Sequence, residues 1–384
     1  MLQCGTRICR IKEVESMKSF GTFIRGKGFS TLFSIFSFLS IFYVADRMGR
    51  LLESIFHHDF RLIVFSLLAI LMGYMLFYIK SKKEIKTTRN LYEICSVILC
   101  FLLCLVVFLW GYDFADLLFH IDQDVYYIIP VVLSIGLTFY GFLHAKKLVV
   151  KEYHVSMPQL EKKKKAVLLS DIHVGTFVDL QQLAKIVEKV NALQADLVLI
   201  AGDMFDVEAF AYCDKAAIAK VLQKLEPKEN VFAVLGNHDP KSSTDEIKQF
   251  YKDAKIQLLI DQEVELKDFI LIGRDDVMTN SKRKSLYEIE KESSSRKPRI
   301  VIDHNPSGIA EAVAQKADLI VCGHTHKGQF FPANIFTKLA YGKQGYYGYY
   351  REKSTQSIVS SGVGYFQMPM RIGSNSEIVV INME

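Results

Sequence analysis

The chain changes its hydrophobic pattern close to residue 149. Before that point the apolar residues form four long, nearly uncharged runs: Phe29–Ala45, Leu62–Ile79, Tyr92–Trp110 and Tyr126–Leu143. Each run is long enough, or almost long enough, to span a bilayer, and none shows the polar face of a helix from a water-soluble core. The pattern predicts a basic tail at 1–28, a region of four transmembrane helices at 29–148 and a second domain at 149–384.

The first run is the shortest, and the core of a signal peptide is its alternative interpretation. No A-x-A-like cleavage site follows it, and Asp46-Arg47 is an unfavourable exit for such a peptide. A membrane span is therefore the favoured interpretation.

Lysine and arginine in the short loops predict the orientation of the spans. Basic residues precede the first run, separate the second from the third and follow the fourth, whereas the loop after the third carries four aspartates and no basic residue. The mixed loop 46–61, with Arg47, Arg50 and Arg61, runs against this scheme. We expect a multi-pass protein of the inner membrane with both termini and the second domain in the cytoplasm. The net charge of +5 requires no nucleic-acid partner.

Five short apolar runs in the second half each end abruptly in Asp, Asn or His. They are Ala166–Gly175 (AVLLSDIHVG), Leu197–Asp206 (LVLIAGDMFD), Val231–Asp239 (VFAVLGNHD), Ile300–His304 (IVIDH) and Val321–Phe330 (VCGHTHKGQF). Such runs predict buried parallel strands, and the helical spacing of apolar residues in Asp179–Leu193 predicts a helix after the first. Because ligands bind beyond the carboxyl ends of parallel strands, we expect all five ends at one edge of one sheet.

The histidines strengthen this expectation. All five that follow Val155 stand at the ends of these runs: His173, His238, His304, His324 and His326. A pair such as His324 and His326 also occurs by chance. The convergence of five run ends makes a metal cluster the better interpretation.

At these residues the sequence resembles the calcineurin-like metallophosphoesterases, whose motifs D-x-H, G-D, G-N-H-[DE], a lone His and G-H-x-H occur here in order. It is most similar to a bacterial membrane-associated branch, which adds a Gly-x-Asp-Asp strand end, here in Leu271–Asp276 (LIGRDD), and a C-terminal S-x-G-x-G…P-x-R…E-I pattern. That pattern is represented by Ser360–Gly364, Pro369, Arg371, Glu377 and Ile378. The resemblance covers Val149 to Glu384 and implies an α/β/β/α four-layer sandwich. Lys327 departs from it, since that branch usually has glycine there, and it would place a cation beside the metals.

The resemblance implies two divalent metal ions held by two sets of three side chains and one bridging carboxylate. The sets are Asp171, His173 and His326, then Asn237, His304 and His324, with Asp203 as the bridge. Imidazole, carboxylate and amide oxygen together suit Mn, Fe, Zn or Co rather than Ca. Two-metal sites hydrolyse phosphate esters and pyrophosphates with a metal-activated hydroxide, which is the reaction expected here.

Two further residues receive roles from the resemblance. His238 would protonate the leaving oxygen or stabilise the transition state, and Asp206 would hold it, in keeping with acid–base design. A turn or cap role is the alternative for Asp206. Asp239 is expected to be a cap or turn carboxylate.

Four spans exceed what tethering requires, so the expected substrate is a lipid-linked phosphate at the inner leaflet, with membrane lipids as partners. One alternative is an anchored nucleotide phosphodiesterase acting on soluble substrates. Another is a non-catalytic membrane sensor, against which the presence of His238 argues.

Tyr341–Lys353 (YGKQGYYGYYREK) leaves two interpretations open. Tyrosines with flanking cations suit the bilayer interface, where Tyr346, Tyr347, Tyr349 and Tyr350 would form a lip. The alternative is a glycine-rich hairpin whose tyrosines pack on the sheet.

Overall fold

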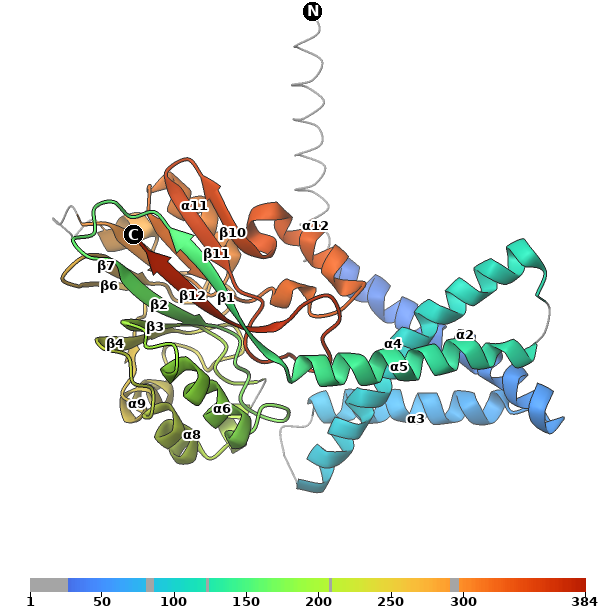
Figure 1. Ribbon diagram of the computed structural model, residues 1–384. Coiled ribbons are helices and arrows are strands. Elements are labelled where there is room, and N and C mark those ends of the chain that lie inside the picture. Colours follow the sequence, from blue (N-terminus) through green and yellow to red (C-terminus); the bar gives the residue numbers. More distant parts are fainter. Residues whose placement is uncertain (1–26, 81–85, 122–123, 207–208, 291–296) are drawn as a thin grey trace, which may run out of the picture. The chain divides into compact units, whose positions relative to one another are not determined.

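The structure is a computed structural model that describes residues 27–80, 86–121, 124–206, 209–290 and 297–384 (Figure 1). The predicted basic tail lies outside the described residues, apart from its last two positions. The chain divides into two compact units. One is helical and comprises the described residues up to His144 together with Gln367–Met370; the other, here called the catalytic unit, comprises Ala145–Phe366 and Arg371–Glu384.

The helical unit contains one helix for each predicted apolar run. They are α2 (Lys27–Phe56), α3 (Arg61–Lys80), α4 (Lys86–Phe119) and α5 (Ile128–Ala145), with the 3-10 helix η1 (Asp124–Tyr127) before α5. Within the described residues, Leu91–Phe119 and Asp124–Ala145 are long and apolar enough to cross a membrane, and Arg61–Met75 is a shorter apolar helix. Two of the four predicted spans therefore satisfy this test.

Asp113 joins three parts of the helical unit through its carboxylate. It accepts hydrogen bonds from the hydroxyls of Tyr43 (2.7 Å) and Tyr127 (3.2 Å) and pairs with Arg47 at 2.9 Å. Arg50 and Arg61 pair with Asp46 at 3.1 and 3.5 Å. The three arginines that run against the predicted orientation are thus each paired with a neighbouring carboxylate.

The first sheet of the catalytic unit has six strands in the order β1-β12-β2-β3-β4-β5. Their bounds are β1 (Leu148–Val155), β12 (Ser376–Met383), β2 (Lys164–Leu169), β3 (Leu197–Ala201), β4 (Asn230–Val234) and β5 (Gln257–Leu258). All neighbours are parallel except β12 and β2. The predicted parallel strands are confirmed for β2, β3 and β4.

The second sheet also has six strands, in the order β10-β11-β9-β8-β7-β6. Their bounds are β10 (Gly348–Glu352), β11 (Thr355–Val359), β9 (Leu319–Cys322), β8 (Arg299–Ile302), β7 (Ile270–Gly273) and β6 (Gln262–Glu265). The four central strands are parallel, and the pairs at the two edges are antiparallel.

The two sheets pack face to face around one core. Strand β2 turns Ala166 and Leu168 into it, and β8 contributes Ile300 and Ile302 from the other side. The neighbouring residue Val167 points to the opposite face of the first sheet, where helices cover it. This alternation with period two explains why both faces of these strands are apolar.

Helices cover the outer faces of both sheets. The first sheet is covered by α6 (Leu180–Asn191), α8 (Lys215–Leu222) and α9 (Asp245–Asp253), and the second by α10 (Leu286–Glu290) and α11 (Ile309–Ala314). The remaining elements are α7 (Ala209–Tyr212), η2 (Pro306–Gly308), η3 (His326–Gly328) and α12 (Ala333–Tyr346). The predicted α/β/β/α sandwich is confirmed, as is the helix after the first run, which Asp179 caps by accepting from the Gln182 N–H.

One expectation about the strands is wrong. Three of the five apolar runs form β2, β3 and β4 of the first sheet, but the other two form β8 and β9 of the second. The sequence could not separate them, because strands buried between layers have the same continuous apolar pattern in both sheets. The polar run ends still meet, since the carboxyl ends of both strand sets lie at a common edge of the sandwich.

Candidate metal centre

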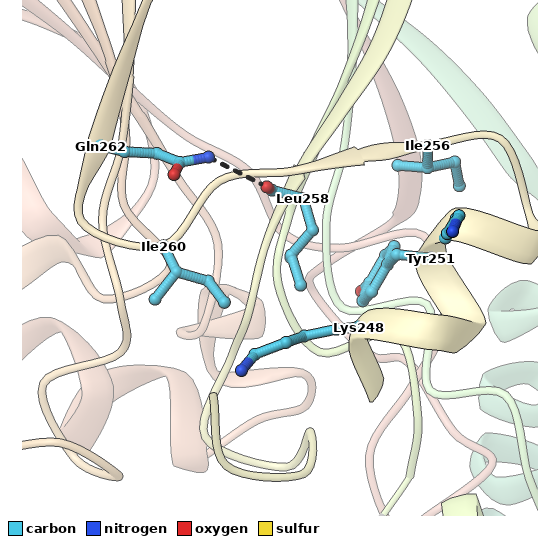
Figure 2. Close-up of a pocket in the computed structure, with 7 residues that line it drawn as sticks. Lys248, Tyr251, Ile256, Leu258, Ile260 and Gln262 are labelled. Carbon is cyan, nitrogen blue, oxygen red and sulfur yellow. Dashed lines mark hydrogen bonds between the residues drawn. The ribbon is translucent and has the colours of Figure 1, made fainter. Parts of the chain in front are cut away.

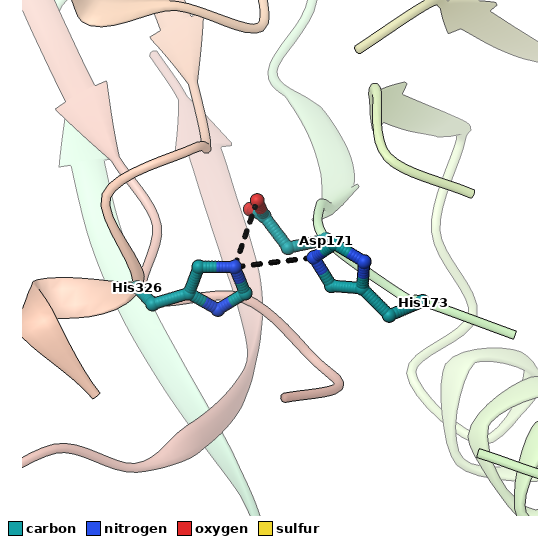
Figure 3. A group of neighbouring side chains, drawn as sticks. All are labelled: Asp171, His173 and His326. Atoms are coloured by element: carbon teal, nitrogen blue, oxygen red, sulfur yellow. Dashed lines mark hydrogen bonds and ion pairs between the residues drawn. The ribbon is translucent and has the colours of Figure 1, made fainter. Parts of the chain in front are cut away.

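The first predicted set of ligands forms a compact buried group (Figure 3). Asp171 and His173 follow β2, and His326 opens η3 after β9. Nε2 of His173 lies 3.1 Å from Nε2 of His326, which is 3.4 Å from Oδ1 of Asp171. The arrangement brings two imidazole nitrogens and a carboxylate to one point, where a metal ion could accept all three.

The second predicted set lies beside the first. Nε2 of His304 is 3.1 Å from Oδ1 of Asn237, and Nδ1 of His324 is 2.7 Å from the same oxygen. The two ring nitrogens are themselves 3.2 Å apart. His304 comes from the end of β8, Asn237 from the loop after β4 and His324 from the loop after β9.

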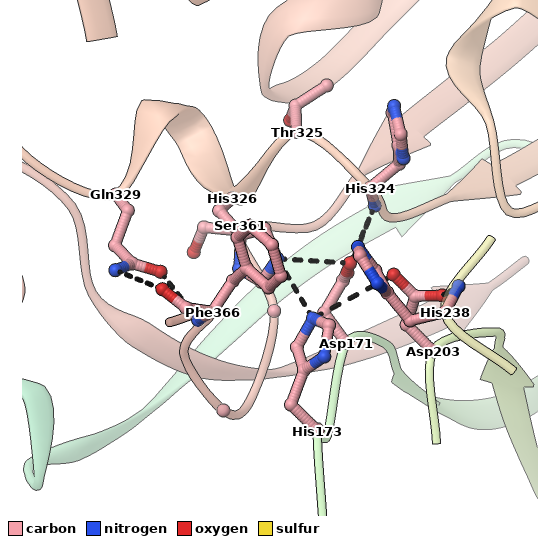
Figure 4. Close-up of polar contacts among 12 residues, drawn as sticks. Asp171, His173, Asp203, His238, His324, Thr325, His326, Gln329, Ser361 and Phe366 are labelled. Carbon is pink, nitrogen blue, oxygen red and sulfur yellow. Dashed lines mark hydrogen bonds and ion pairs between the residues drawn. The ribbon is translucent and has the colours of Figure 1, made fainter. Parts of the chain in front are cut away.

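Asp203 contacts both sets, and Figure 4 shows it next to His238. Its Oδ2 is 3.2 Å from Nε2 of His304 and 3.8 Å from Nε2 of His173. Its Oδ1 accepts the backbone N–H of His238 at 2.8 Å. One buried carboxylate therefore reaches a histidine of each set.

The protonation states also suit cations. Burial lowers the pKa of His173 and of His324 to about 3, so both imidazoles are neutral near pH 7 and keep a lone pair for a metal. Burial alone would lower the pKa of His304 too, but the charges of Asp203 and Asp171 outweigh it and raise that pKa well above its usual value. Positive charge is therefore favoured among these oxygens, which fits a site for divalent ions.

The backbone at the cluster is strained. Five of the seven predicted ligands have φ between 49° and 73°, a region that side chains other than glycine rarely adopt: Asp171, His173, Asp203, His324 and His326. Each such residue costs on the order of 1–3 kcal/mol and persists only where the surrounding structure enforces it, which is characteristic of functional sites. The other loops of the unit show no comparable grouping among the described residues.

Two motif glycines are required by the carboxylates beside them. A Cβ on Gly236 would collide with the Asp203 carboxylate, and one on Gly323 would collide with that of Asp171. Asp239 supports the same loops, since it accepts the backbone N–H groups of Gly236 (2.9 Å) and Phe205 (3.1 Å). This matches the turn role expected for Asp239.

The two predicted acid–base residues lie at the rim of the cluster. The half-buried ring of His238 packs against His173, with ring centroids 5.4 Å apart, and burial lowers its pKa. The charged side chains that act on it include Asp203 and Asp276. The Asp206 carboxylate lies 4.0 Å from Nδ1 of His173, so its hold on His238 stays a prediction.

Two aromatic residues at the cluster were missed from the sequence. The hydroxyl of Tyr341 in α12 is 2.7 Å from Nε2 of His324, the nitrogen that faces away from Asn237. The ring of Phe366 packs on His238 at 4.6 Å and on His173 at 5.6 Å. Neither belongs to a motif, and Tyr341 stood out in the sequence only as one of several tyrosines.

The C-terminal pattern supports the loop that holds the cluster. Arg371 is fully buried and donates to the carbonyls of Ser361 (2.8 Å), Gly364 (2.5 Å) and His326 (3.4 Å). Glu377 accepts the backbone N–H of Ser361 at 2.9 Å. Burial lowers the pKa of Arg371 to about 10, which still leaves the guanidinium charged near pH 7.

Lys327, the departure from the family pattern, has φ of 52°. Glycine adopts this conformation without strain, which gives a physical reason for the glycine usual at this position. The Lys327 ammonium lies 4.5 Å from the ring centroid of Tyr347, in the range of a cation–π interaction.

The tyrosine-rich segment follows the hairpin interpretation. After α12 it forms β10, which pairs with β11. The hydroxyls of Tyr346, Tyr347 and Tyr349 bind the Lys327 carbonyl (3.3 Å), Glu377 (2.8 Å) and Gln356 (2.9 Å). These tyrosines pack within the catalytic unit, which argues against the predicted lip.

A cavity of about 420 Å³ lies at the edge strand β5 (Figure 2). Its lining residues are Lys248, Tyr251, Lys252, Ile256, Leu258, Ile260 and Gln262. The predicted metal ligands do not line it, so it is separate from the candidate metal centre.

The comparisons with known proteins agree with this geometry. Residues 164–328 match the family of calcineurin-like phosphoesterases. A Helicobacter pylori protein described as a metallophosphoesterase is 33% identical over 246 residues, which cover 61% of this chain and 63% of the relative. A metallophosphoesterase of Campylobacter jejuni is 28% identical over 377 residues, covering 92% of this chain and 99% of the relative. A zebrafish transmembrane protein with metallophosphoesterase domain is 30% identical, covering 66% of this chain and 62% of the relative.

Residues 164–328 therefore form a domain similar to the calcineurin-like phosphoesterases. The matched region spans just under two thirds of the Helicobacter relative. The name of the zebrafish relative and the two long apolar helices favour association with a membrane.

Proposed function

We propose that this chain is a membrane-bound, metal-dependent phosphoesterase that hydrolyses a phosphate ester or pyrophosphate. One divalent ion would be held by Asp171, His173 and His326, and the other by Asn237, His304 and His324, with Asp203 bridging. The observation that carries the proposal is the convergence of strand ends from both sheets on one buried group of imidazoles and carboxylates. The strained backbone at five of these residues supports a functional rather than a structural role.

Two divalent ions held there would supply Lewis-acid catalysis at a phosphoryl group. The chain itself positions the remaining chemistry. His238 stands at the rim, where its imidazole can hold a proton for the leaving oxygen. Its backbone N–H is anchored on Asp203, so the proton donor and the proposed bridge keep a fixed relation.

We further propose a multi-pass protein of the inner membrane with the catalytic unit in the cytoplasm and a lipid-linked phosphate as substrate. The Lys and Arg residues of the other short loops support this orientation, and the three arginines of 46–61 run against it. An anchored nucleotide phosphodiesterase is the second candidate. Assaying the detergent-purified chain on lipid and nucleotide phosphoesters separates the two.

The metal assignment is tested by Asp203→Asn, which keeps the shape of the side chain and removes its charge. Hydrolysis of bis-p-nitrophenyl phosphate should be abolished, and bound metal measured by mass spectrometry should fall. The matched control is Asp245→Asn, whose carboxylate is exposed on α9, and it should behave as the natural chain does. Full activity in a folded, metal-depleted Asp203→Asn variant would refute the two-metal assignment. A non-catalytic sensor would bind metal without hydrolysing any of these esters.

A further inference from the structure

Helix α12 and the residues before it leave a row of apolar side chains exposed on the catalytic unit. Phe331 is 52% exposed, Ile335 47% and Leu339 36%. Ile335 and Leu339 are four residues apart and lie on the same side of α12, and Phe331 precedes the helix by two residues. We call Phe331, Ile335 and Leu339 the α12 row.

The row belongs to a concentration of exposed apolar surface. Eight large hydrophobic side chains are exposed in the described part of the catalytic unit, and four of them lie between Phe331 and Leu339. The other four are Leu180, Met278, Tyr287 and Tyr349, of which only Met278 and Tyr287 are close in the sequence. Single exposed apolar residues are ordinary, whereas a contiguous group marks a surface that binds something.

The other side of α12 holds the helix on the unit. The Tyr341 hydroxyl is bonded to Nε2 of His324, and the backbone of Asn334 lies against Gly328. After a kink at Gly342, Gly345 packs against Pro306. The α12 row is therefore fixed in place. It also lies beside Tyr341 of the same helix, whose hydroxyl contacts the proposed metal ligand His324.

The composition of α12 favours a lipid surface as its partner. Its sequence, ANIFTKLAYGKQGY, contains Lys338 and Lys343 and no acidic residue. Lys338 is exposed and adjoins Leu339 in the row. Basic residues beside an exposed apolar surface favour anionic lipid headgroups, to which each contributes about 1 kcal/mol.

Only a short segment connects α5 to the first strand of the catalytic unit. The apolar segment Asp124–Ala145 ends two residues before β1 begins at Leu148. If this segment spans the bilayer, the catalytic unit is tethered by a very short link. A short link gives the tethered surface a high effective concentration at its partner. The inference rests on the proposed attachment to a membrane.

We propose that the α12 row docks the catalytic unit on the lipid bilayer, with Lys338 directed to anionic headgroups. Docking brings the metal centre, through Tyr341 and His324, to the level of the lipid headgroups. It thereby assigns phospholipids or other lipid phosphates of the same leaflet as the substrate class.

The docking is tested by fluorescence in the full chain. The sequence has one tryptophan, Trp110, so Trp110→Phe gives a silent background into which Leu339→Trp is introduced. The chain is reconstituted into vesicles of equal parts phosphatidylcholine and phosphatidylglycerol with brominated acyl chains. Bromine should quench Leu339→Trp strongly and should leave Leu180→Trp, a matched exposed leucine on α6, nearly unquenched.

Two other results of this experiment would each overturn the proposal. Quenching of Leu339→Trp by aqueous iodide and not by bromine would mean that the row faces water. Protection from both quenchers would mean that protein covers it, either the chain's own helices or a second copy.

A second experiment separates this proposal from the proposed function. The double variant Ile335→Glu with Leu339→Glu should raise KM for a phospholipid in the same vesicles by about tenfold or more, because two apolar contacts become charged. Hydrolysis of bis-p-nitrophenyl phosphate should stay within about twofold, since the α12 row does not touch the proposed ligands. Leu180→Glu is the control and should change neither.

The outcomes differ when either proposal fails. If the natural chain hydrolyses the soluble ester but the double variant keeps its KM for the lipid, the docking proposal is wrong and the proposed function stands. If the natural chain hydrolyses neither substrate, the proposed function is wrong, and the fluorescence result still decides the docking.

Discussion

The Asp113 group of the helical unit and the metal centre of the catalytic unit pair their polar side chains in opposite ways. In the helical unit, the Asp113 carboxylate is met by three donors, from Tyr43, Arg47 and Tyr127. In the catalytic unit, ring nitrogens and carboxylate oxygens are turned toward one another. Within the described residues, Nδ1 of His326 and Oδ2 of Asp276 are buried without a hydrogen-bond partner.

This difference in pairing distinguishes the Asp113 group, which stabilises the helices, from the candidate metal centre, which is available to a ligand. Polar groups that satisfy each other fully hold helices together and leave nothing for a ligand. Groups that are buried, strained and incompletely paired are retained at a cost in stability, which is expected where a metal or substrate completes them. The following predictions test this contrast, beginning with the largest effect.

The largest effect is expected for His238→Ala. Loss of a proton donor for the leaving oxygen should lower kcat by about 10²–10⁴-fold. Metal content should stay unchanged, because the Asp203 contact uses the backbone N–H of residue 238, which alanine keeps. The loss should shrink for esters with acidic leaving groups such as p-nitrophenol. A variant without metal would instead mark His238 as a ligand or a structural support.

The next effect concerns stability and tests whether the buried pairs of the catalytic unit also hold the fold. Arg371→Met leaves the carbonyls of Ser361 and Gly364 without their donor and should lower the free energy of unfolding by about 3 kcal/mol. Thermal unfolding of the detergent-purified chain measures this. Arg351→Met removes an exposed arginine of β10 and should leave the transition almost unchanged. Equal midpoints for both variants would contradict the supporting role of Arg371.

The predictability of the fold also differs between the units. Short apolar runs that end in Asp171, Asp203 or His304 predicted strands and a shared edge. This was possible because a buried strand and the polar residues at its end are adjacent in the sequence. The division of these strands between two sheets was not predictable, since pairing partners such as Val321 and Ile302 are chosen by packing across the chain. The two-sheet sandwich itself was foreseen only through the family resemblance.

In the helical unit, the hydrophobic pattern of the sequence did not predict where the helices end. The first apolar run ends at Ala45, but α2 continues to Phe56 through Asp46 and Arg47, because helical hydrogen bonding does not require apolar side chains. At the metal centre the sequence missed Tyr341 for a related reason. Its bond to His324 depends on how α12 packs, and no local spacing encodes that contact.

A smaller effect is expected for Tyr341→Phe. The hydroxyl fixes Nε2 of His324, which keeps Nδ1 of that ring directed at Asn237. Loss of such an outer partner typically weakens metal affinity about 10–100-fold. Calorimetric titration of the metal-stripped chain with Mn²⁺ should show this loss. Tyr350→Phe, from the same tyrosine-rich segment, is the control. Equal affinities in the two variants would show that Tyr341 does not position the ligand.

The smallest effect is expected in the helical unit, where we expect the Asp113 group to affect stability and not hydrolysis. Arg47→Gln removes the charge that pairs with Asp113 at a position about one quarter exposed, and Tyr43 and Tyr127 still satisfy the carboxylate. The free energy of unfolding of the detergent-purified chain should therefore fall by about 1 kcal/mol or less. Hydrolysis of bis-p-nitrophenyl phosphate should be unaffected, because the proposed metal ligands belong to the other unit. A marked loss of hydrolysis at unchanged stability would show that the Asp113 group acts on the catalytic unit and would remove the distinction between the two.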